Sequence, residues 1–220
     1  KKNQIRIILT KMVNVLELFA GSRSIGKAAY KLGYNVFSSD INAFDNIDYV
    51  VDILDFDINK VPFKPDIIWS SPPCTSFSVA SIGKHWNKDH TPKSKNAILG
   101  IEIVKKTLSI IKKLNPNKWY IENPRGKLRK LQIMRNLPLT TIWYCKYGDT
   151  RAKPTDVWSN NIYSLLNPSG WIPREECFNG NKKCHHQSAP RGSQTGTQGL
   201  KGNYNRSKIP EELCLEILSS

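Results

Sequence analysis

One stretch of the chain decides the fold: Val13-Asn-Val-Leu-Glu-Leu-Phe19, followed at once by Ala20-Gly-Ser-Arg-Ser24. The first part is a short apolar run typical of a buried strand, and the second is a turn of small residues. Residues 25–32 then have helical spacing and stop at Gly33, a residue typical of helix C-termini. A strand, a tight turn and a helix in this order predict the first unit of an α/β sheet.

The same alternation continues along the chain. Further strands are predicted over residues 35–39, 47–51, 66–70 and 118–121, and helices over residues 96–114 and 127–135. The long helix has one predicted apolar face, made of Ile98, Ile101, Val104, Leu108 and Ile111. This order predicts an open, mainly parallel, Rossmann-like sheet with helices on both faces. In such sheets ligands bind at the carboxyl ends of the strands.

Three parts are expected. Residues 12–158 form the core, residues 159–204 a small irregular module, and residues 205–220 a C-terminal helix that packs back on the core. The module lacks regular periodicity and is rich in glycine and proline, which is why it is separated from the core. Residues 1–11 precede Met12, and no function is assigned to them.

Composition limits the class of protein. Lys plus Arg is 33 and Asp plus Glu is 18, so the formal net charge is +15, which favours a nucleic acid as partner. The 39% of hydrophobic residues excludes a disordered chain. No apolar run approaches the roughly 18 residues of a membrane span, and no signal peptide is visible, so a cytoplasmic protein without membrane contact is expected. Five cysteines in such a chain indicate core residues, metal ligands or a nucleophile, and no disulfide framework.

Polar residues follow three of the predicted strands. The turn at Gly21 lets backbone N–H groups approach a ligand closely, although an ordinary strand-to-helix turn explains it equally well. Asp40 and Asp52 end the next two strands. One carboxylate there can accept both hydroxyls of a ribose and the other an adenine amino group, while a helix N-cap is the open alternative for each.

Two further motifs carry the chemistry. Ser71-Pro-Pro-Cys74-Thr-Ser-Phe-Ser78 follows an apolar strand, and its two prolines stiffen the backbone and leave the thiol at the strand end. Tyr120-Ile-Glu122-Asn-Pro-Arg125 places a carboxyl group at the same edge. A cysteine nucleophile and a glutamate that face one pocket suit attack on a ring carbon while a ring nitrogen is hydrogen-bonded.

Taken in order, these motifs resemble those of the DNA (cytosine-5) methyltransferases. The Pro-Pro-Cys-x-x-Phe-Ser segment and the later Glu-Asn are the specific part, and the resemblance covers residues 13–161 and, more faintly, 205–218. The segment Lys153-Pro-Thr-Asp-Val-Trp158 is similar to the small enzymes of phages and mobile elements, often linked to restriction–modification. The resemblance makes residues 12–158 the catalytic core and residues 159–204 a reduced target-recognition module.

The resemblance implies a mechanism and a cofactor. Cys74 would add to C6 of a flipped-out cytosine, Glu122 would hold the N3 and amino edge, and Arg151 and Lys153 would contact the base oxygen or a phosphate. The activated C5 would receive a methyl group from S-adenosyl-L-methionine. The cofactor would be bound by Phe19, Ala20, Gly21, Ser22, Asp40, Ile41, Asp52, Ile53, Pro73 and Leu99. The turn Gly-Ser-Arg-Ser and the triplet Glu-Asn-Pro depart from the usual Gly-rich turn and Glu-Asn-Val.

Double-stranded DNA is the expected partner, and a monomer the expected state. In the resemblance, residues 76–95 are the loop that closes over the target base. The residues expected to contact nucleic acid are Ser76, Ser78, Lys84, His85, Arg125, Arg129, Arg191, Gln194 and Gln198. A solvated helix face and a flexible linker are the alternatives for the basic run and for the last three residues. An RNA (tRNA) cytosine-5 methyltransferase and a catalytically silent DNA-binding or decoy protein remain open.

Zinc is a weaker hypothesis for the module, which contains Cys177-x6-Cys184-His185-His186. The gap of six residues is wider than the usual two to four. Cys145 would complete a set of four ligands, but nothing in the sequence places it nearby. Ordinary polar packing is the favoured interpretation.

Overall fold

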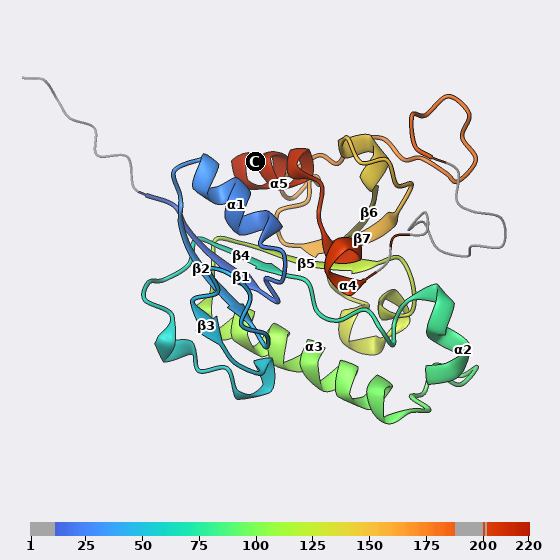
Figure 1. Cartoon of the computed structure of the whole chain (residues 1–220), viewed down its shortest axis with the longest axis horizontal. Coiled ribbons are helices and arrows are strands. Elements are labelled where there is room, and N and C mark those ends of the chain that lie inside the picture. Colours follow the sequence, from blue (N-terminus) through green and yellow to red (C-terminus); the bar gives the residue numbers. More distant parts are fainter. Residues whose placement is uncertain (1–11, 188–199, 201) are drawn as a thin grey trace, which may run out of the picture.

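The computed structural model describes residues 12–187, 200 and 202–220. Its centre is a seven-stranded sheet in the order β3-β2-β1-β4-β5-β7-β6 (Figure 1). The strands are β1 (Asn14–Leu18), β2 (Asn35–Asp40), β3 (Tyr49–Val50), β4 (Ile67–Ser70), β5 (Lys118–Pro124), β6 (Leu139–Trp143) and β7 (Pro154–Ser159). The first five strands pair in parallel, and β7 lies antiparallel between β5 and β6. The predicted open, mainly parallel sheet is confirmed.

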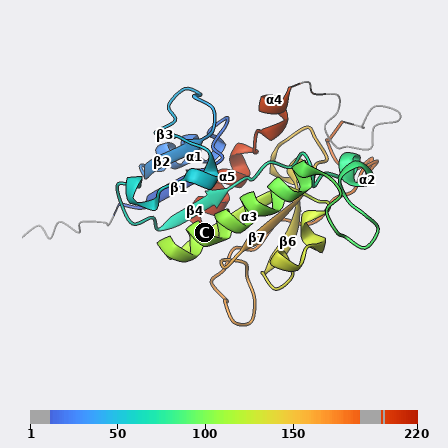
Figure 2. The same cartoon turned by 90° about the horizontal axis from the view of Figure 1, so that it is seen from below.

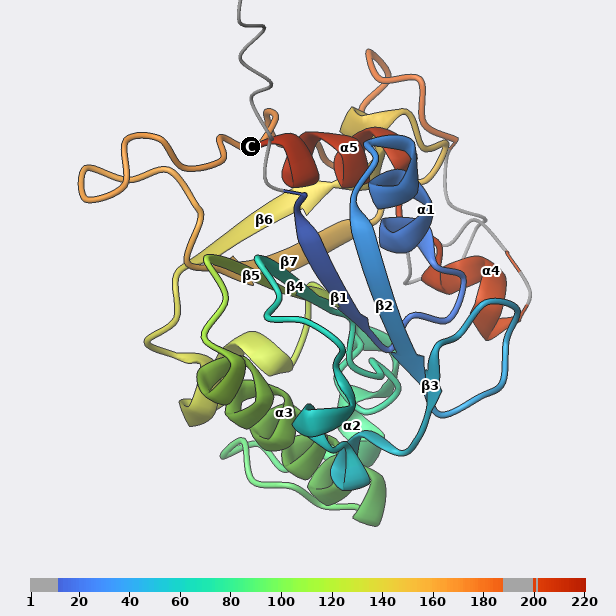
Figure 3. The ribbon, with the colours of Figure 1, turned by 90° about the vertical axis from the view of Figure 1, so that its left-hand side faces the viewer.

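Helices cover both faces of the sheet (Figure 3). The first face carries α1 (Ser24–Lys31) and α5 (Glu211–Ser219), and the opposite face carries α3 (Lys95–Leu114), which lies lengthwise along the sheet in Figure 2. Two short helices complete the set, α2 (Ile82–His85) and α4 (Asn203–Ser207). Single 3₁₀ turns are η1 (Ile53–Asp55), η2 (Ile58–Lys60), η3 (Val79–Ser81), η4 (Leu128–Lys130), η5 (Gln132–Met134) and η6 (Tyr144–Tyr147).

Each face of the sheet has its own hydrophobic core. Because successive strand residues point to opposite faces, Val15 and Trp69 pack with α1 and α5, whereas Leu16 and Ile68 pack with α3. Within the described residues no helix is long and apolar enough to cross a membrane.

Three expectations about local structure are wrong. The helix expected over residues 127–135 is two 3₁₀ turns, because Leu131 between them is extended (φ −80°, ψ 140°). The strand expected over residues 47–51 is only Tyr49–Val50. Ile98 is 52% exposed, because α3 turns its small residues Ala97 and Gly100 toward the sheet instead.

Candidate active site

The site lies at the carboxyl ends of β1, β4 and β5, where the strand order reverses beside β1. Cys74 follows β4 and Glu122 lies near the end of β5. Asn123 joins the two segments, because its side-chain Nδ2 donates a hydrogen bond of 2.8 Å to the carbonyl of Pro72. Gly126 lets the segment after β5 pack tightly on the segment after β4, since a Cβ atom there would lie 2.3 Å from the carbonyl oxygen of Phe77. The two predicted catalytic segments are therefore packed directly on each other.

Glu122 is held on two sides within this pocket. Tyr144 donates a hydrogen bond of 3.1 Å from its hydroxyl to Glu122 Oε1, and Lys153 Nζ lies 3.8 Å from the same oxygen. The strand β7 brings Lys153 opposite Tyr144, whose N–H donates to the carbonyl of Lys153. All three side chains are buried. The arrangement fixes one carboxylate oxygen of Glu122, whose charge also acts on the thiol of Cys74.

Opposing effects act on the thiol of Cys74, the predicted nucleophile. Burial raises the pKa of the Cys74 thiol above its ordinary value, the cation of Lys153 lowers it, and the nearby Glu122 raises it. Burial and the neighbouring Glu122 also raise the pKa of Tyr144 well above its usual value, so this phenol stays a hydrogen-bond donor. A thiolate at Cys74 is therefore favoured mainly by Lys153.

Arg151, the other predicted catalytic cation, is already engaged. Its Nε donates to both carboxylate oxygens of Asp149, at 2.9 and 3.0 Å. Its terminal nitrogens donate to the carbonyls of Arg206 and Lys208, at 3.3 and 3.0 Å. Arg151 thus ties the segment between α4 and α5 to the turn that precedes β7.

The turn after β1 is built from left-handed residues. Phe19, Gly21 and Arg23 have φ values of 57°, 46° and 54°. The N–H of Gly21 donates 2.9 Å to Asp40 Oδ2, and the N–H of Ala20 donates 3.0 Å to the carbonyl of Ser39. Asp40 therefore holds the turn against the end of β2 while its Oδ1 accepts the N–H of Asn42.

The residues at these strand ends fit a nucleoside. Asp40 pairs with Val50 in the register of β2 and β3, which brings it beside the segment that leads to Asp52. Asp52 caps η1, since its Oδ1 accepts the N–H of Leu54, so the N-cap alternative holds for this residue. The predicted apolar contacts are unevenly exposed: Ile41 is 62% exposed and Leu99 48% exposed. Phe19 is half-buried, Pro73 exposed, and Ala20 and Ile53 buried. Carboxylates flanked by uncovered apolar side chains suit a ribose and an adenine ring.

A cavity of about 800 Å³ opens beside the same turn, on the side of α1. It is lined by Gly21, Ser22, Arg23, Lys27, Tyr30, Ala43, Phe44, Asp45, Asn46 and Tyr204. Gly21 and Ser22 are the two predicted cofactor residues among them. The cavity therefore adjoins the predicted site without containing its carboxylates.

The segment after Cys74 is folded more tightly than expected. Ser76 and His85 are buried; His85 Nδ1 and Ser94 Oγ lie 2.6 Å apart, and Trp86 Nε1 donates to the carbonyl of Ser76. Both side chains face the interior, and the expectation that Ser76 and His85 contact nucleic acid stays a prediction. Ser78 is half-buried, and Lys84 is exposed.

Arg129 has partners within the chain. Its Nε donates 2.8 Å to Asp156 Oδ2, and its Nη2 donates to Thr141 Oγ1. Asp156 is fully buried on β7, so Arg129 neutralises a buried carboxylate, and its contact with a phosphate stays a prediction. Arg125 is exposed, with its guanidinium 5.4 Å from the centre of the Trp143 ring. Arg191, Gln194 and Gln198 lie outside the described residues.

Sequence reasoning missed Tyr144 and Asp149 as site residues. Tyr144 follows a strand that the apolar pattern did not reveal, and tyrosine in such a position is usually a core residue. Asp149 stands two residues before Arg151 in a turn, a spacing that was a usable signal for an ion pair.

The fold has known counterparts. No family model matches the chain. Among solved structures, a methyltransferase of Entamoeba histolytica, EhMeth, superimposes with a TM-score of 0.51 at 15% identity, over 76% of this chain and 58% of that one. This chain thus spans little more than half of the solved enzyme. The fold is the α/β fold of the class I methyltransferases.

The sequence also has a relative that matches along nearly its whole length. It is 28% identical over 218 residues to a probable DNA (cytosine-5)-methyltransferase of Frog virus 3, which covers 94% of this chain and 99% of the viral protein. The relationship to the DNA (cytosine-5)-methyltransferases that the motifs predicted is confirmed.

Proposed function

We propose that this protein transfers a methyl group from S-adenosyl-L-methionine to C5 of cytosine in DNA. The observation that carries the proposal is the cluster at the ends of β4 and β5, where Cys74, Glu122 and Lys153 act on one another electrostatically. A half-buried thiol beside a fixed carboxylate suits addition to an electron-poor ring. The viral relative, whose name specifies DNA, favours this polymer over RNA.

In the proposed reaction the thiolate of Cys74 forms a bond to C6 of the extruded cytosine, which makes C5 nucleophilic. Glu122 holds the N3 and amino edge of the base, positioned by Tyr144 and Lys153. The bound cofactor supplies an electrophilic methyl group. A water molecule then accepts the C5 proton, and the electrons of the C5–H bond restore the C5–C6 double bond as Cys74 leaves C6 as a thiolate, so the enzyme is regenerated.

The cofactor is assigned to the edge formed by β1, β2 and β3. Asp40 would accept a ribose hydroxyl while it keeps the turn at Gly21 in place. Asp52 would accept the adenine amino group through the oxygen that does not cap η1. Ile41 and Leu99 would lose exposed apolar surface on cofactor binding, which favours association.

The test is a parallel methylation assay with labelled cofactor on unmodified duplex DNA and on tRNA. The proposal predicts 5-methylcytosine in DNA alone, and none with Cys74→Ala. Cys74→Ala should still bind DNA and cofactor, because the loss of a nucleophile leaves the binding surface intact. Methylation of tRNA alone would favour the RNA alternative. A chain that binds DNA but not the cofactor in calorimetry would be a silent DNA-binding protein.

A further inference from the structure

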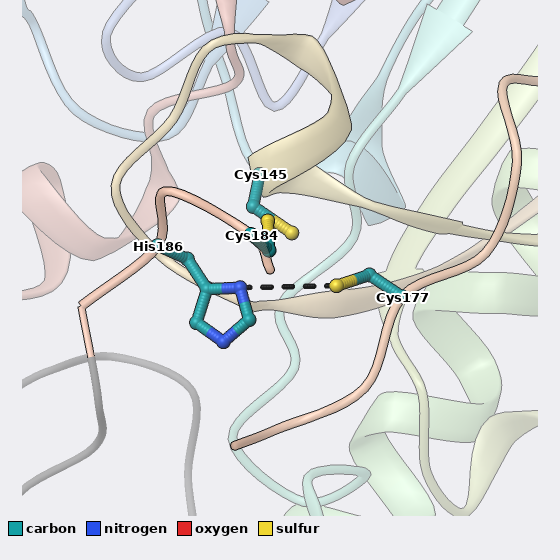
Figure 4. Close-up of side chains that lie close together, drawn as sticks. All are labelled: Cys145, Cys177, Cys184 and His186. Carbon is teal, nitrogen blue, oxygen red and sulfur yellow. Dashed lines mark hydrogen bonds between the residues drawn. The ribbon is translucent and has the colours of Figure 1, made fainter. Parts of the chain in front are cut away.

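Three cysteines and one histidine converge at η6 (Figure 4). They are Cys145, Cys177, Cys184 and His186, and their potential ligand atoms all lie within 4.8 Å of one another. Cys145 lies in η6, directly after Tyr144, whereas the other three come from a loop more than thirty residues further along the chain. The tertiary structure thus supplies the fourth ligand that the sequence spacing did not reveal.

The spacing within the cluster suits a tetrahedral ion. Zinc binds cysteine sulfur at about 2.3 Å and histidine nitrogen at about 2.0 Å, so a sulfur and a nitrogen on one tetrahedral ion lie about 3.5 Å apart. Cys177 Sγ and His186 Nδ1 are 3.8 Å apart. A shift of a few tenths of an ångström would bring this pair to ligand geometry.

The local fold gives a reason for a metal. Residues 172–187 contain neither helix nor strand, and the small core beneath them consists of Trp143, Cys145, Ala152 and Cys177. A hydrophobic core of this size is too small to hold an irregular loop of sixteen residues, and metal binding is a common substitute in such modules. A disulfide would use two of the three thiols and leave the third thiol and the imidazole of His186 without a partner of equal strength.

We propose that Cys145, Cys177, Cys184 and His186 bind one structural zinc ion. Three thiolates and an imidazole form a closed set of four protein ligands, which is typical of structural and not catalytic zinc, and soft thiolates select zinc over magnesium or calcium.

The proposed zinc site connects the small module to the turn that precedes β7 and carries Asp149 and Arg151. Immediately beside it, His185 Nε2 lies 3.1 Å from the carbonyl of Asp149, and the N–H of Gln187 donates 2.9 Å to the carbonyl of Thr150. Asp149 in turn pairs with Arg151. A metal at this point would hold the loop against the turn that carries Arg151 and leads to Lys153. The inference does not depend on the proposed reaction.

The test uses the full chain, purified without a polyhistidine tag from zinc-supplemented cells and analysed for metal by mass spectrometry. We expect about one zinc per chain in the wild type. The variants His186→Ala and Cys177→Ser should lose most of the zinc. Two controls should retain it: His185→Ala, which changes the adjacent histidine outside the cluster, and Cys74→Ser, which changes a cysteine at the end of β4. Equal loss in His185→Ala and His186→Ala would overturn the assignment.

A second measurement on the wild type keeps the proposal testable if the cluster variants fail to fold. Cobalt added to the metal-free chain should give the thiolate-to-cobalt charge-transfer and d–d absorption bands of a tetrahedral site, and zinc should displace it. A wild-type chain that contains no zinc and gives no such bands contradicts the proposal. A disulfide between any two of the three cysteines in the freshly purified native protein contradicts it as well.

Discussion

The hydroxyl of Tyr144 and Oε1 of Glu122 are joined by a hydrogen bond of 3.1 Å, and both residues are buried. Lys153 approaches the same oxygen, and its ammonium lies 4.6 Å from the centre of the Tyr144 ring. Glu122 therefore takes its orientation from two neighbouring segments of the sheet, the turn after β6 and the residue before β7. The catalytic role proposed for Glu122 depends on both.

Tyr144→Phe should slow methyl transfer about tenfold or more, because it leaves one oxygen of a buried carboxylate short of a donor, at a cost of about 1–3 kcal/mol. Single-turnover rates on duplex DNA measure the effect. Tyr147→Phe is the matched control: this buried hydroxyl accepts the N–H of Arg174 and lies away from Glu122 in the hydrogen-bond network. If the two variants lose activity equally, Tyr144 acts through general packing alone.

Lys153→Met should shift the rising limb of the pH–rate profile to higher pH. The cation of Lys153 lowers the pKa of Cys74 against the effect of burial, so its removal raises that pKa further and reduces the thiolate fraction at any given pH. Lys153→Arg should leave the rising limb close to its wild-type position, because the substitution keeps the positive charge. Alkylation of the Cys74 peptide, followed by mass spectrometry across pH, measures the same change without turnover. An unchanged alkylation profile in Lys153→Met would show that Lys153 does not lower the pKa of Cys74.

Asp40→Ala should weaken S-adenosyl-L-methionine binding by about 1.5–3 kcal/mol, the usual contribution of a hydrogen bond to a charged group. Asp52→Ala should weaken it less, because a single amino contact is involved. Asp57→Ala is the control for Asp52, since Asp57 caps η2 in the same way but follows no strand of the predicted site. Titration calorimetry gives the three affinities. Wild-type binding by both Asp40→Ala and Asp52→Ala would show that the cofactor lies elsewhere, for example in the neighbouring cavity.

Stability should fall as the pH rises from about 4.5 to about 7. Burial raises the pKa of Glu17 from 4.5 to about 7, although its carboxyl accepts the N–H groups of Ile25 and Gly26. Between these two pKa values the folded chain holds a proton that the unfolded chain has lost, so the free energy of unfolding decreases with pH, by about 1–3 kcal/mol in total. Urea unfolding of Glu17→Gln should show a flatter dependence over this range. The same slope in both proteins would assign the effect to another group.

The sequence predicted the parts of the fold that depend on local pattern. The strand, turn and helix around Gly21 and the long helix near Val104 follow from periodicity and from residues that end helices. The strands β6 and β7 were not predicted, because their sequences lack a simple alternation of apolar and polar residues. Their pairing with each other and with β5 becomes visible only in the folded sheet. The ends of β4 and β5 were predicted to meet, and they do, because parallel strands end at one edge.

Long-range contacts account for the remaining differences at the site. Arg129 resembles a phosphate contact in the sequence, but the buried Asp156, twenty-seven residues away, binds its guanidinium. His85 stands among basic residues, yet it packs inward against Ser94. Cys145 was separated from Cys177 by more than thirty residues, and only the folded chain brings the two together.

The most direct test of the central claim is covalent trapping on duplex DNA that contains 5-fluorocytosine, in the presence of S-adenosyl-L-methionine. The fluorine at C5 cannot leave as a proton does, so the Cys74–C6 bond should persist. We expect a denaturation-resistant complex with the wild type, mapped by mass spectrometry to the Cys74 peptide, and none with Cys74→Ala. An equal yield of complex from Cys74→Ala, or methylation of ordinary DNA by the wild type without any trapped complex, would contradict it.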